Sequence, residues 1–323
     1  MRRLLSGLTA GTLLFAAAAC GSSGGSDAPN ASESSGKVTT VEVGVIPILD
    51  VAPLYLGQKK GFYEQHGLKL TMTTAQGGAA IVPGVVSGQF QFGFSNMTSL
   101  MIAQTGGVPV KAVVNGVNST GVQGEDFGAV VVRKDSPITS AKELEGKKVA
   151  LNTLRNINET AVRESVRKAG GDPDEVHMVE LAFDQMPAAL DQGRIDAAMV
   201  VEPALATVLS QGGREIASSL VDVAENLTVA MYFTSAQYEK QHPDVVEKFR
   251  EATAQSLAYA DGHPDEVRQI VTTYTRIPAD VLARTTFPKW PAEPNRASIE
   301  ALAELGEQDG LFKKAPDLDA LLP

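Results

Sequence analysis

The chain has 323 residues, in which 28 lysines and arginines face 38 aspartates and glutamates, for a formal net charge of −10. This acidic balance, without a run of basic residues, excludes a nucleic-acid binder and a protein held to an anionic membrane by charge, since both need a basic footprint. Cys20 is the only cysteine, which excludes an intramolecular disulfide and a cysteine-based metal site.

The first 20 residues have the pattern of an export signal. Arg2 and Arg3 precede an uncharged apolar run, residues 4–19, which is short for a membrane span and ends in alanines. The junction Ala19-Cys20-Gly21 resembles the lipobox of bacterial lipoproteins, which implies a diacylated Cys20 as the new N-terminus. Ordinary signal-peptidase cleavage after Ala19 is the alternative, but it gives the single cysteine no purpose.

Residues 21–37 are rich in glycine and serine and almost free of apolar side chains. Such a segment cannot bury surface, so we expect a flexible tether. The remaining residues, 38–323, are enough for two domains of ordinary size. Without Arg2 and Arg3, 26 basic residues face 38 acidic ones, a net charge of −12.

The folded part of the chain is predicted to open with alternating strands and helices. A β-branched strand at 41–46 is followed by a loop at 47–50 and a helix at 52–60 that Gly61 ends. Residues 62–66 extend the helical segment to Gly67, and 68–73 form the next strand. This order is typical of an α/β fold.

One pattern occurs twice in the later sequence. Its copies are residues 82–107 and residues 181–204, the second with a continuation to Gly212. They align at a constant offset that places Gly88 on Gly193, and each predicts a helix, a glycine, a buried strand, a polar residue and a second helix. In the second copy the apolar strand ends at Glu202-Pro203, where a proline suits a helix start. This repeat has two possible explanations. It can reflect the general likeness of any two βα units, or it can reflect two similar α/β lobes that face a shared crevice.

The segment VGVIPILDVAPLYLGQKKGFYEQHGLKL, residues 43–70, resembles the opening of the substrate-binding proteins of nitrate, sulfonate, taurine and thiamine-pyrimidine ABC importers. The order and spacing of further short matches extend the resemblance over some 200 residues. These matches are Gly77-Gly78, residues 87–89, 106–110, 136–138, 144–147, 188–190 and 196–198, Glu202-Pro203, and residues 242–244.

The resemblance implies a type II periplasmic-binding-protein fold, with two α/β lobes, two hinge strands and a ligand cleft between the lobes. We place the hinge strands at 129–133 and near 227–234, with lobe 1 at 38–127 plus 229–323 and lobe 2 at 128–228. Amphipathic helices are expected at 243–261, 264–274 and 296–305 in the return to lobe 1.

Ligand contacts are expected where strands end and helices begin, because free N–H groups and the helix dipole bind polar or anionic atoms there. In lobe 1 this rule selects the loop 47–50 with Asp50, then Gly77, Gly78, Ser95 and Asn96. In lobe 2 it selects Asn152, Thr153, Arg155, Phe183, Asp184 and Glu202.

Most of these residues also have a structural interpretation. The serine and asparagines suit helix caps, the glycines a turn, Asp50 the cap of the helix after it, and Phe183 the core. Glu202 is the strongest candidate for ligand contact, since an acid between an apolar strand and a proline is badly placed for solvation alone. Arg155 could clamp a sulfonate or carboxylate, or pair with Asp184 or Glu202 in the empty state.

No motif in the sequence supplies a catalytic nucleophile and base or a phosphate-binding loop, and the four histidines are scattered. One branch of the resembling family, the fungal pyrimidine synthase, is an enzyme, but its cysteine-rich motif has no counterpart here. We therefore expect a monomeric, non-catalytic protein without a cofactor, which captures a sulfonate, taurine or aminopyrimidine-like molecule for a permease and its ATPase. A tethered sensor remains a third alternative.

Overall fold

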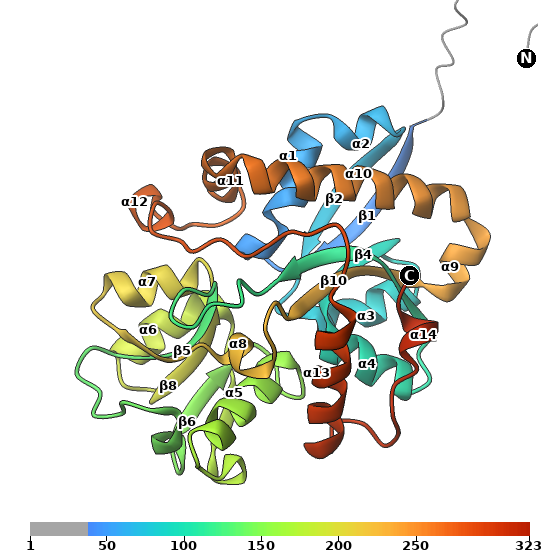
Figure 1. Ribbon diagram of the computed structural model, residues 1–323. Helices are drawn as coiled ribbons and strands as arrows, with labels where there is room; N and C mark the ends of the chain where they lie inside the picture. The colour runs from blue at the N-terminus through green and yellow to red at the C-terminus, as the bar shows by residue number, and fades with distance from the viewer. Residues whose placement is uncertain (1–37) are drawn as a thin grey trace, which may run out of the picture. The chain divides into compact units, whose positions relative to one another are not determined.

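The structure, a computed structural model, describes residues 38–323 (Figure 1). The predicted export signal, Cys20 and the tether lie outside the described residues. Two five-stranded sheets organise this part of the chain. None of its helices combines the length and the apolar content needed to cross a membrane.

The first sheet has the strand order β2-β1-β3-β10-β4, in which β1 pairs in parallel with β2 and β3. Its strands are β1 (Thr39–Val45), β2 (Leu68–Thr74), β3 (Phe92–Asn96), β4 (Val110–Asn118) and β10 (Thr228–Ser235). β3 and β10 are buried along their whole length, as expected of central strands covered on both faces.

The second sheet has the order β7-β6-β8-β5-β9 and repeats this arrangement. Its strands are β5 (Gly128–Val132), β6 (Lys148–Leu151), β7 (His177–Glu180), β8 (Ala197–Val201) and β9 (Arg214–Ala217). In both sheets the fourth position holds an antiparallel strand, β10 in the first and β5 in the second. The two mixed α/β sheets agree with the predicted pair of lobes.

The predicted hinge strands are close to β5 and β10, each displaced by about one residue. Each of these strands lies inside a sheet, and the chain passes from one sheet to the other in residues 119–127 and 218–227. Strands of the first sheet come from 39–118 and 228–235, and those of the second from 128–217. The lobe limits themselves stay a prediction.

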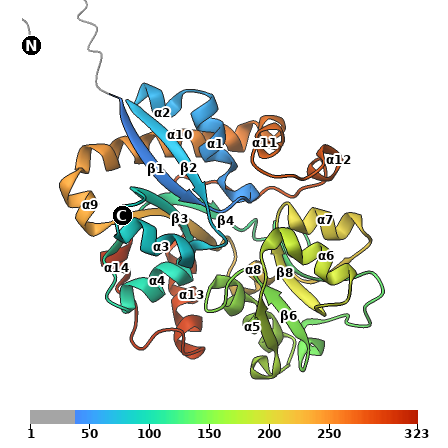
Figure 2. The ribbon, with the colours of Figure 1, turned by 180° about the vertical axis from the view of Figure 1, so that it is seen from behind.

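Helices cover the two sheets, and both views show α3 and α4 beside the first sheet and α6 and α7 beside the second (Figures 1 and 2). In the first half of the chain they are α1 (Ala52–Lys59), α2 (Phe62–Gln65), α3 (Gly78–Val86), α4 (Met97–Thr105) and α5 (Ile157–Lys168). Next come α6 (Met186–Asp191), α7 (Ala204–Ser210), α8 (Ser219–Val223) and α9 (Ala236–Gln241). The last are α10 (Pro243–Gly262), α11 (Pro264–Val271), α12 (Ala279–Leu282), α13 (Arg296–Gln308) and α14 (Leu318–Leu321).

The predicted internal repeat is present in the structure. The offset that places Gly88 on Gly193 also places β3 on β8, residue for residue, and the two glycines share a left-handed backbone, with φ of 79° and 64°. Glycine adopts this conformation without a Cβ clash, which explains its position at the end of each preceding helix.

The C-terminal third of the chain returns to the first sheet, as predicted. α10 packs on α1 and α2, and Phe249 of α10 stacks on Phe92 of β3 with ring centroids 3.8 Å apart. The predicted helix at 264–274 ends at Val271, and α12 and α14 were not predicted. α13 packs against α4 as well as against α5 and α8, so it joins elements that accompany both sheets.

Candidate functional site

Three cavities share walls between the two sheets. The inner cavity, about 30 Å³, is lined by residues of both sheets: Ile46, Ile48, Asp50, Phe94, Asn96, Asn152, Asn156, Ile157, Asn158, Phe183, Val201, Val229 and Ala230. The outer cavity, about 600 Å³, adds Pro47, Asp184, Pro203, Ala204 and residues 274–277. The side cavity, about 270 Å³, adds Thr74, Ala75, Gln76 and Ala182.

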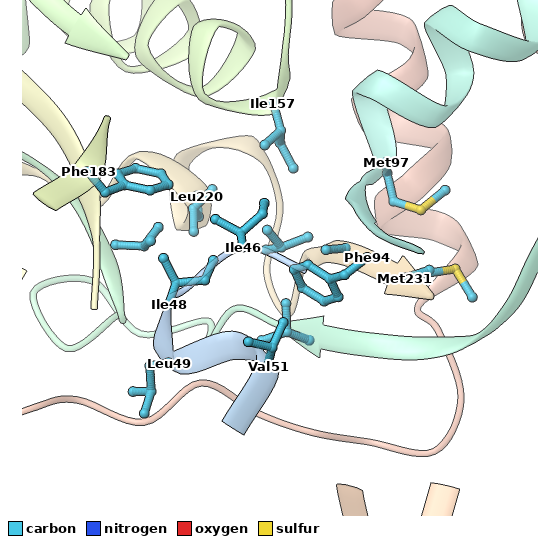
Figure 3. Packing of buried hydrophobic residues seen from close by; sticks show 14 of the residues in the cluster. Ile46, Ile48, Leu49, Val51, Phe94, Met97, Ile157, Phe183, Leu220 and Met231 are labelled. Atoms are coloured by element: carbon cyan, nitrogen blue, oxygen red, sulfur yellow. The ribbon is translucent and has the colours of Figure 1, made fainter. Parts of the chain in front are cut away.

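Ile48 and Phe183 line all three cavities. Figure 3 shows Ile46 and Ile48, which follow β1, opposite Phe183 and Ile157 of the second sheet's elements. Phe183 is buried, which agrees with its interpretation as a core residue, and its contact with a ligand stays a prediction. Asp184 is exposed and lines the outer and side cavities.

Asp50 is the only charged side chain among the residues that line the inner cavity. Only 2% of its surface is exposed, and its Oδ1 atom is buried without a hydrogen-bond partner in the described part of the chain. Burial, together with a smaller effect of the nearby carboxylates of Asp126 and Glu202, raises the pKa of Asp50 to about 7. The expected cap role is wrong, because Val51 occupies the N-cap of α1 and no side chain caps that helix.

Four asparagines line the inner cavity. Asn96 and Asn156 cap α4 and α5, and Asn152, Asn156 and Asn158 bond to one another. Asn96 Oδ1 accepts from Ser99 N of α4 at 2.9 Å and from Ile157 N of α5 at 3.4 Å. Asn156 caps α5, since its Oδ1 accepts from the amides of residues 158 and 159 at 3.0 and 3.2 Å. Asn152 Oδ1 accepts from the amide groups of Asn156 and Asn158 at 2.7 and 2.8 Å. Asn96 is therefore a helix cap, in agreement with its predicted structural role.

The two sheets' loops touch at Gln76 and Asn152. Gln76 Nε2 donates to the Asn152 carbonyl at 2.7 Å, and Asn152 Nδ2 donates back to the Gln76 carbonyl at 3.3 Å. A Cβ atom on Gly77 would lie 2.9 Å from Thr153 Cγ2 and 3.0 Å from Asn152 Nδ2. Gly77 thus permits the close approach of the two loops, and Gly77 and Thr153 lie at the contact rather than in a cavity wall.

Gly78 and Ser95 are packing residues. A Cβ atom on Gly78 would lie 2.1 Å from Ser95 Oγ and 2.7 Å from Ser95 Cα, so only glycine lets α3 approach β3 this closely. Ser95 is fully buried beneath this contact and donates to the Asn96 carbonyl at 3.3 Å. Neither residue lines any of the three cavities, although both were predicted to bind ligand.

Glu202 joins three segments of the chain instead of lining a cavity. Its Oε2 accepts from Ala206 N in the first turn of α7 at 3.0 Å, and its Oε1 accepts from Thr286 N at 3.0 Å. Its carbonyl accepts from Leu49 N at 3.1 Å. The side chain is 1% exposed, and burial raises its pKa to about 7. As the local sequence indicated, this acid is not solvated; in the structure the partners of its carboxylate are backbone amides.

Arg155 also differs from its prediction. It is exposed, its Nη2 donates to the Leu311 carbonyl at 2.7 Å, and it forms no ion pair with Asp184 or Glu202 among the described residues. Nearby on α5, Arg163 and Arg167 both bind Asp309, with Arg163 Nε 2.9 Å from Asp309 Oδ1. We call Arg163, Arg167 and Asp309 the arginine clamp; it ties α5 to the end of α13.

Several cavity residues were not predicted from the sequence. Ile46, Phe94 and Ile157 have the pattern of core positions, and nothing local separates them from neighbouring core residues. Tyr274 lines the outer cavity, donates to the Ile48 carbonyl at 3.0 Å and stacks on Tyr55 with centroids 4.1 Å apart. The described residues hold no cluster of three or more histidine, cysteine or carboxylate side chains suited to a metal.

Comparison with known proteins identifies the family of the chain. The family model described as NMT1/THI5 like matches residues 49–267, about two thirds of the chain. A putative aliphatic sulfonates-binding protein of Bacillus subtilis is 22% identical over 264 residues, which cover 80% of this chain and 74% of that protein. A 4-amino-5-hydroxymethyl-2-methylpyrimidine phosphate synthase of Aspergillus parasiticus is 25% identical over 226 residues, which cover 66% of this chain and 64% of that enzyme.

A solved structure confirms the predicted fold. The periplasmic aliphatic sulphonate binding protein SsuA of Escherichia coli superposes with a TM-score of 0.71 at 19% identity, covering 87% of this chain and 96% of SsuA. The fold is therefore that of the periplasmic binding proteins, two α/β lobes each built on a sheet with one antiparallel strand. Because the family model matches about two thirds of the chain, the chain belongs to the NMT1/THI5-like family.

Proposed function

We propose that the chain is the extracytoplasmic substrate-binding protein of an ABC importer and that it captures a small polar organic molecule between its two lobes. One observation carries the proposal: three adjoining cavities are lined by residues of both sheets. The Bacillus and Escherichia coli relatives, both named as binding proteins for aliphatic sulfonates, support it.

Capture follows from the way the walls divide between the sheets. Ile46, Ile48 and Asp50 follow β1 of the first sheet, whereas Phe183 and Ile157 belong to elements of the second. A ligand that contacts both sets favours the arrangement in which they approach, since only differential contact can shift such an equilibrium. The reciprocal bonds between Gln76 and Asn152 form only when the two loops meet, so they belong to the closed arrangement.

Delivery and anchoring complete the proposal. The closed form docks on a two-subunit permease driven by a cytoplasmic ATPase, and a diacylated Cys20 on the tether of residues 21–37 holds the protein at the outer face of the membrane. Mass spectrometry of the mature N-terminus tests the anchor. A diacylated cysteine supports it, and an unmodified residue 20 contradicts it.

The family also contains an enzyme, so a catalytic alternative is a second candidate. The Aspergillus relative is named as a pyrimidine phosphate synthase. Of the described residues that line the three cavities, none is a histidine, cysteine or lysine, and only Asp50 is a buried acid. This wall supplies no nucleophile paired with a base, which favours binding over catalysis.

A thermal-shift screen of the full-length chain in mild detergent tests capture. The panel holds sulfonates, taurine, nitrate, amines, aminopyrimidines and amino acids. A ligand at 100 times its Kd stabilises the folded protein by about 2.7 kcal/mol and raises Tm by a few degrees. At least one such compound is expected. A flat panel contradicts solute capture and favours the tethered sensor that presents a protein surface.

A further inference from the structure

We propose that the inner cavity binds a compact cationic nitrogen group of the captured solute, with a primary ammonium as the smallest such group and Asp50 as its counter-ion. The inference rests on the proposed function and narrows its ligand class. It assigns the charged end of the solute to the inner cavity and the remainder to the outer and side cavities.

The first support is the unpartnered oxygen of Asp50. Among the described residues that line the inner cavity, only Asp50 contributes a fully buried polar side-chain atom without a hydrogen-bond partner. A buried carboxylate oxygen without a donor costs free energy, so a group that donates to it is stabilised there. A nitrogen cation supplies both the donor and the opposite charge.

The second support is the sign of the charges around Asp50. The residues that line the inner cavity include no lysine, arginine or histidine, and Asp50 belongs to no ion pair in the described part of the chain. The titratable side chains that face it are two acids, Asp126 and Glu202, and two tyrosines, Tyr232 and Tyr274. No group in this set carries a positive charge that would balance the carboxylate of Asp50, and an anion placed beside it would be repelled.

The third support is that the N-termini of α4 and α5, which meet at this cavity, are already occupied by asparagine side chains. Helix N-termini bind anions through free amides, but Asn96 Oδ1 accepts from the amides of Ser99 and Ile157, and Asn156 Oδ1 accepts from the next amides of α5. The N-terminus of α3, at Gly77, has no side-chain cap, and it lies at the loop contact outside the inner cavity. An anionic head group therefore finds the first turns of α4 and α5 already capped, and at the uncapped start of α1 it would lie beside the carboxylate of Asp50.

The fourth support is size. The inner cavity, at about 30 Å³, has room for a group of about one water molecule, which an ammonium matches and a sulfonate exceeds. Ile48, Phe183 and Val201 line both the inner and the outer cavity, so a chain attached to the nitrogen can continue into the 600 Å³ space. The apolar side chains of Ile48 and Phe183 suit the carbon part of such a molecule.

The test uses ligand pairs that share a carbon skeleton and differ only in the head group. Primary alkylamines and diamines are compared with the alkanesulfonates of the same chain length by calorimetry on the full-length chain. Asp50→Asn removes the charge at constant size, and Asp261→Asn, at an exposed position of α10, is the matched control. The amine should bind more tightly than its sulfonate partner, and Asp50→Asn should weaken amine binding about 10- to 150-fold while Asp261→Asn leaves it unchanged.

A pH titration of the wild-type protein gives an independent readout that needs no variant. Since burial raises the pKa of Asp50 to about 7, a cation must displace a proton from it at lower pH. Amine affinity should therefore rise by about tenfold for each pH unit from 5 toward 7 and then level off. Affinity that is flat or falls with pH overturns the proposal even where Asp50→Asn fails to fold.

The outcomes separate this inference from the proposed function. Amine binding that depends on Asp50 supports both. Binding of a sulfonate with wild-type affinity in Asp50→Asn overturns the ammonium site and leaves solute capture standing. Amine binding that is equally tight in Asp50→Asn and in the wild-type protein also overturns the ammonium site. No binding by any compound of either head group contradicts solute capture itself.

Discussion

Substitution of Glu202 distinguishes a structural carboxylate from a ligand contact. The side chain is 1% exposed and accepts two backbone hydrogen bonds, from Ala206 N and Thr286 N at 3.0 Å each. Glu202→Ala leaves both buried amides without an acceptor, at a cost of about 1–3 kcal/mol each. Because the change also removes a buried acid whose pKa is raised, part of this cost is offset. We expect a net loss of roughly 2–4 kcal/mol in the free energy of unfolding at pH 6.

Urea denaturation followed by circular dichroism measures this loss, and Glu64→Ala, at an exposed position of α2, is the control with an expected change below about 0.5 kcal/mol. Ligand affinity of folded Glu202→Ala should stay within a few-fold of the wild-type value, because Glu202 lines no cavity. Unchanged stability together with a tenfold loss of affinity would refute this reasoning and return Glu202 to the ligand.

Three further changes follow from the same structure. Asp309→Asn removes the negative charge from the partly buried arginine clamp and should lower the free energy of unfolding by about 1–3 kcal/mol, since Arg163 and Arg167 keep Asp174 and Glu164 as partners. An unchanged free energy of unfolding in chemical denaturation would contradict the clamp. Gly78→Ala places a Cβ atom 2.1 Å from Ser95 Oγ and should lower the free energy of unfolding by about 1–3 kcal/mol. Gly262→Ala is the control, because a Cβ atom there meets open space and should not destabilise the protein. Equal melting temperatures of the two variants would contradict the packing argument. The pKa of Asp50 is raised from 3.8 to about 7, so the folded state binds more protons than the unfolded state between these pH values. Asp50 alone should therefore lower the free energy of unfolding by up to roughly 4 kcal/mol from pH 4 to pH 8, and Glu202 should add to the same slope. Asp50→Asn should make the slope less steep, and a slope of opposite sign in pH-dependent denaturation would contradict the prediction.

Much of the fold could be predicted from the sequence because its signals are local. A glycine in the left-handed conformation ends each copy of the repeat's first helix, and an apolar run follows it, which identified β3 and β8. The rule that ligands contact the ends of strands selected the loop 47–50, where Ile48 and Asp50 line the inner cavity. The short helices α12 and α14 have too few residues for a clear apolar period.

The side chains of the site were harder to predict, because their direction depends on distant partners. Glu202 bonds to Thr286, and Arg155 bonds to Leu311, at separations of 84 and 156 residues along the chain. No local pattern encodes such pairs. Conversely, Ile46 and Phe94 line the inner cavity with the same apolar character as core residues, so periodicity assigned them to the core.

A crystal structure of the full-length chain with a primary amine bound tests the central claim most directly, namely that a solute is held between the two sheets by Asp50. The predicted result is a nitrogen atom within hydrogen-bond distance of Asp50 Oδ1, with the carbon chain between Ile48 and Phe183. An amine bound on the outer surface, or a ligand whose anionic group occupies the inner cavity, would contradict the claim.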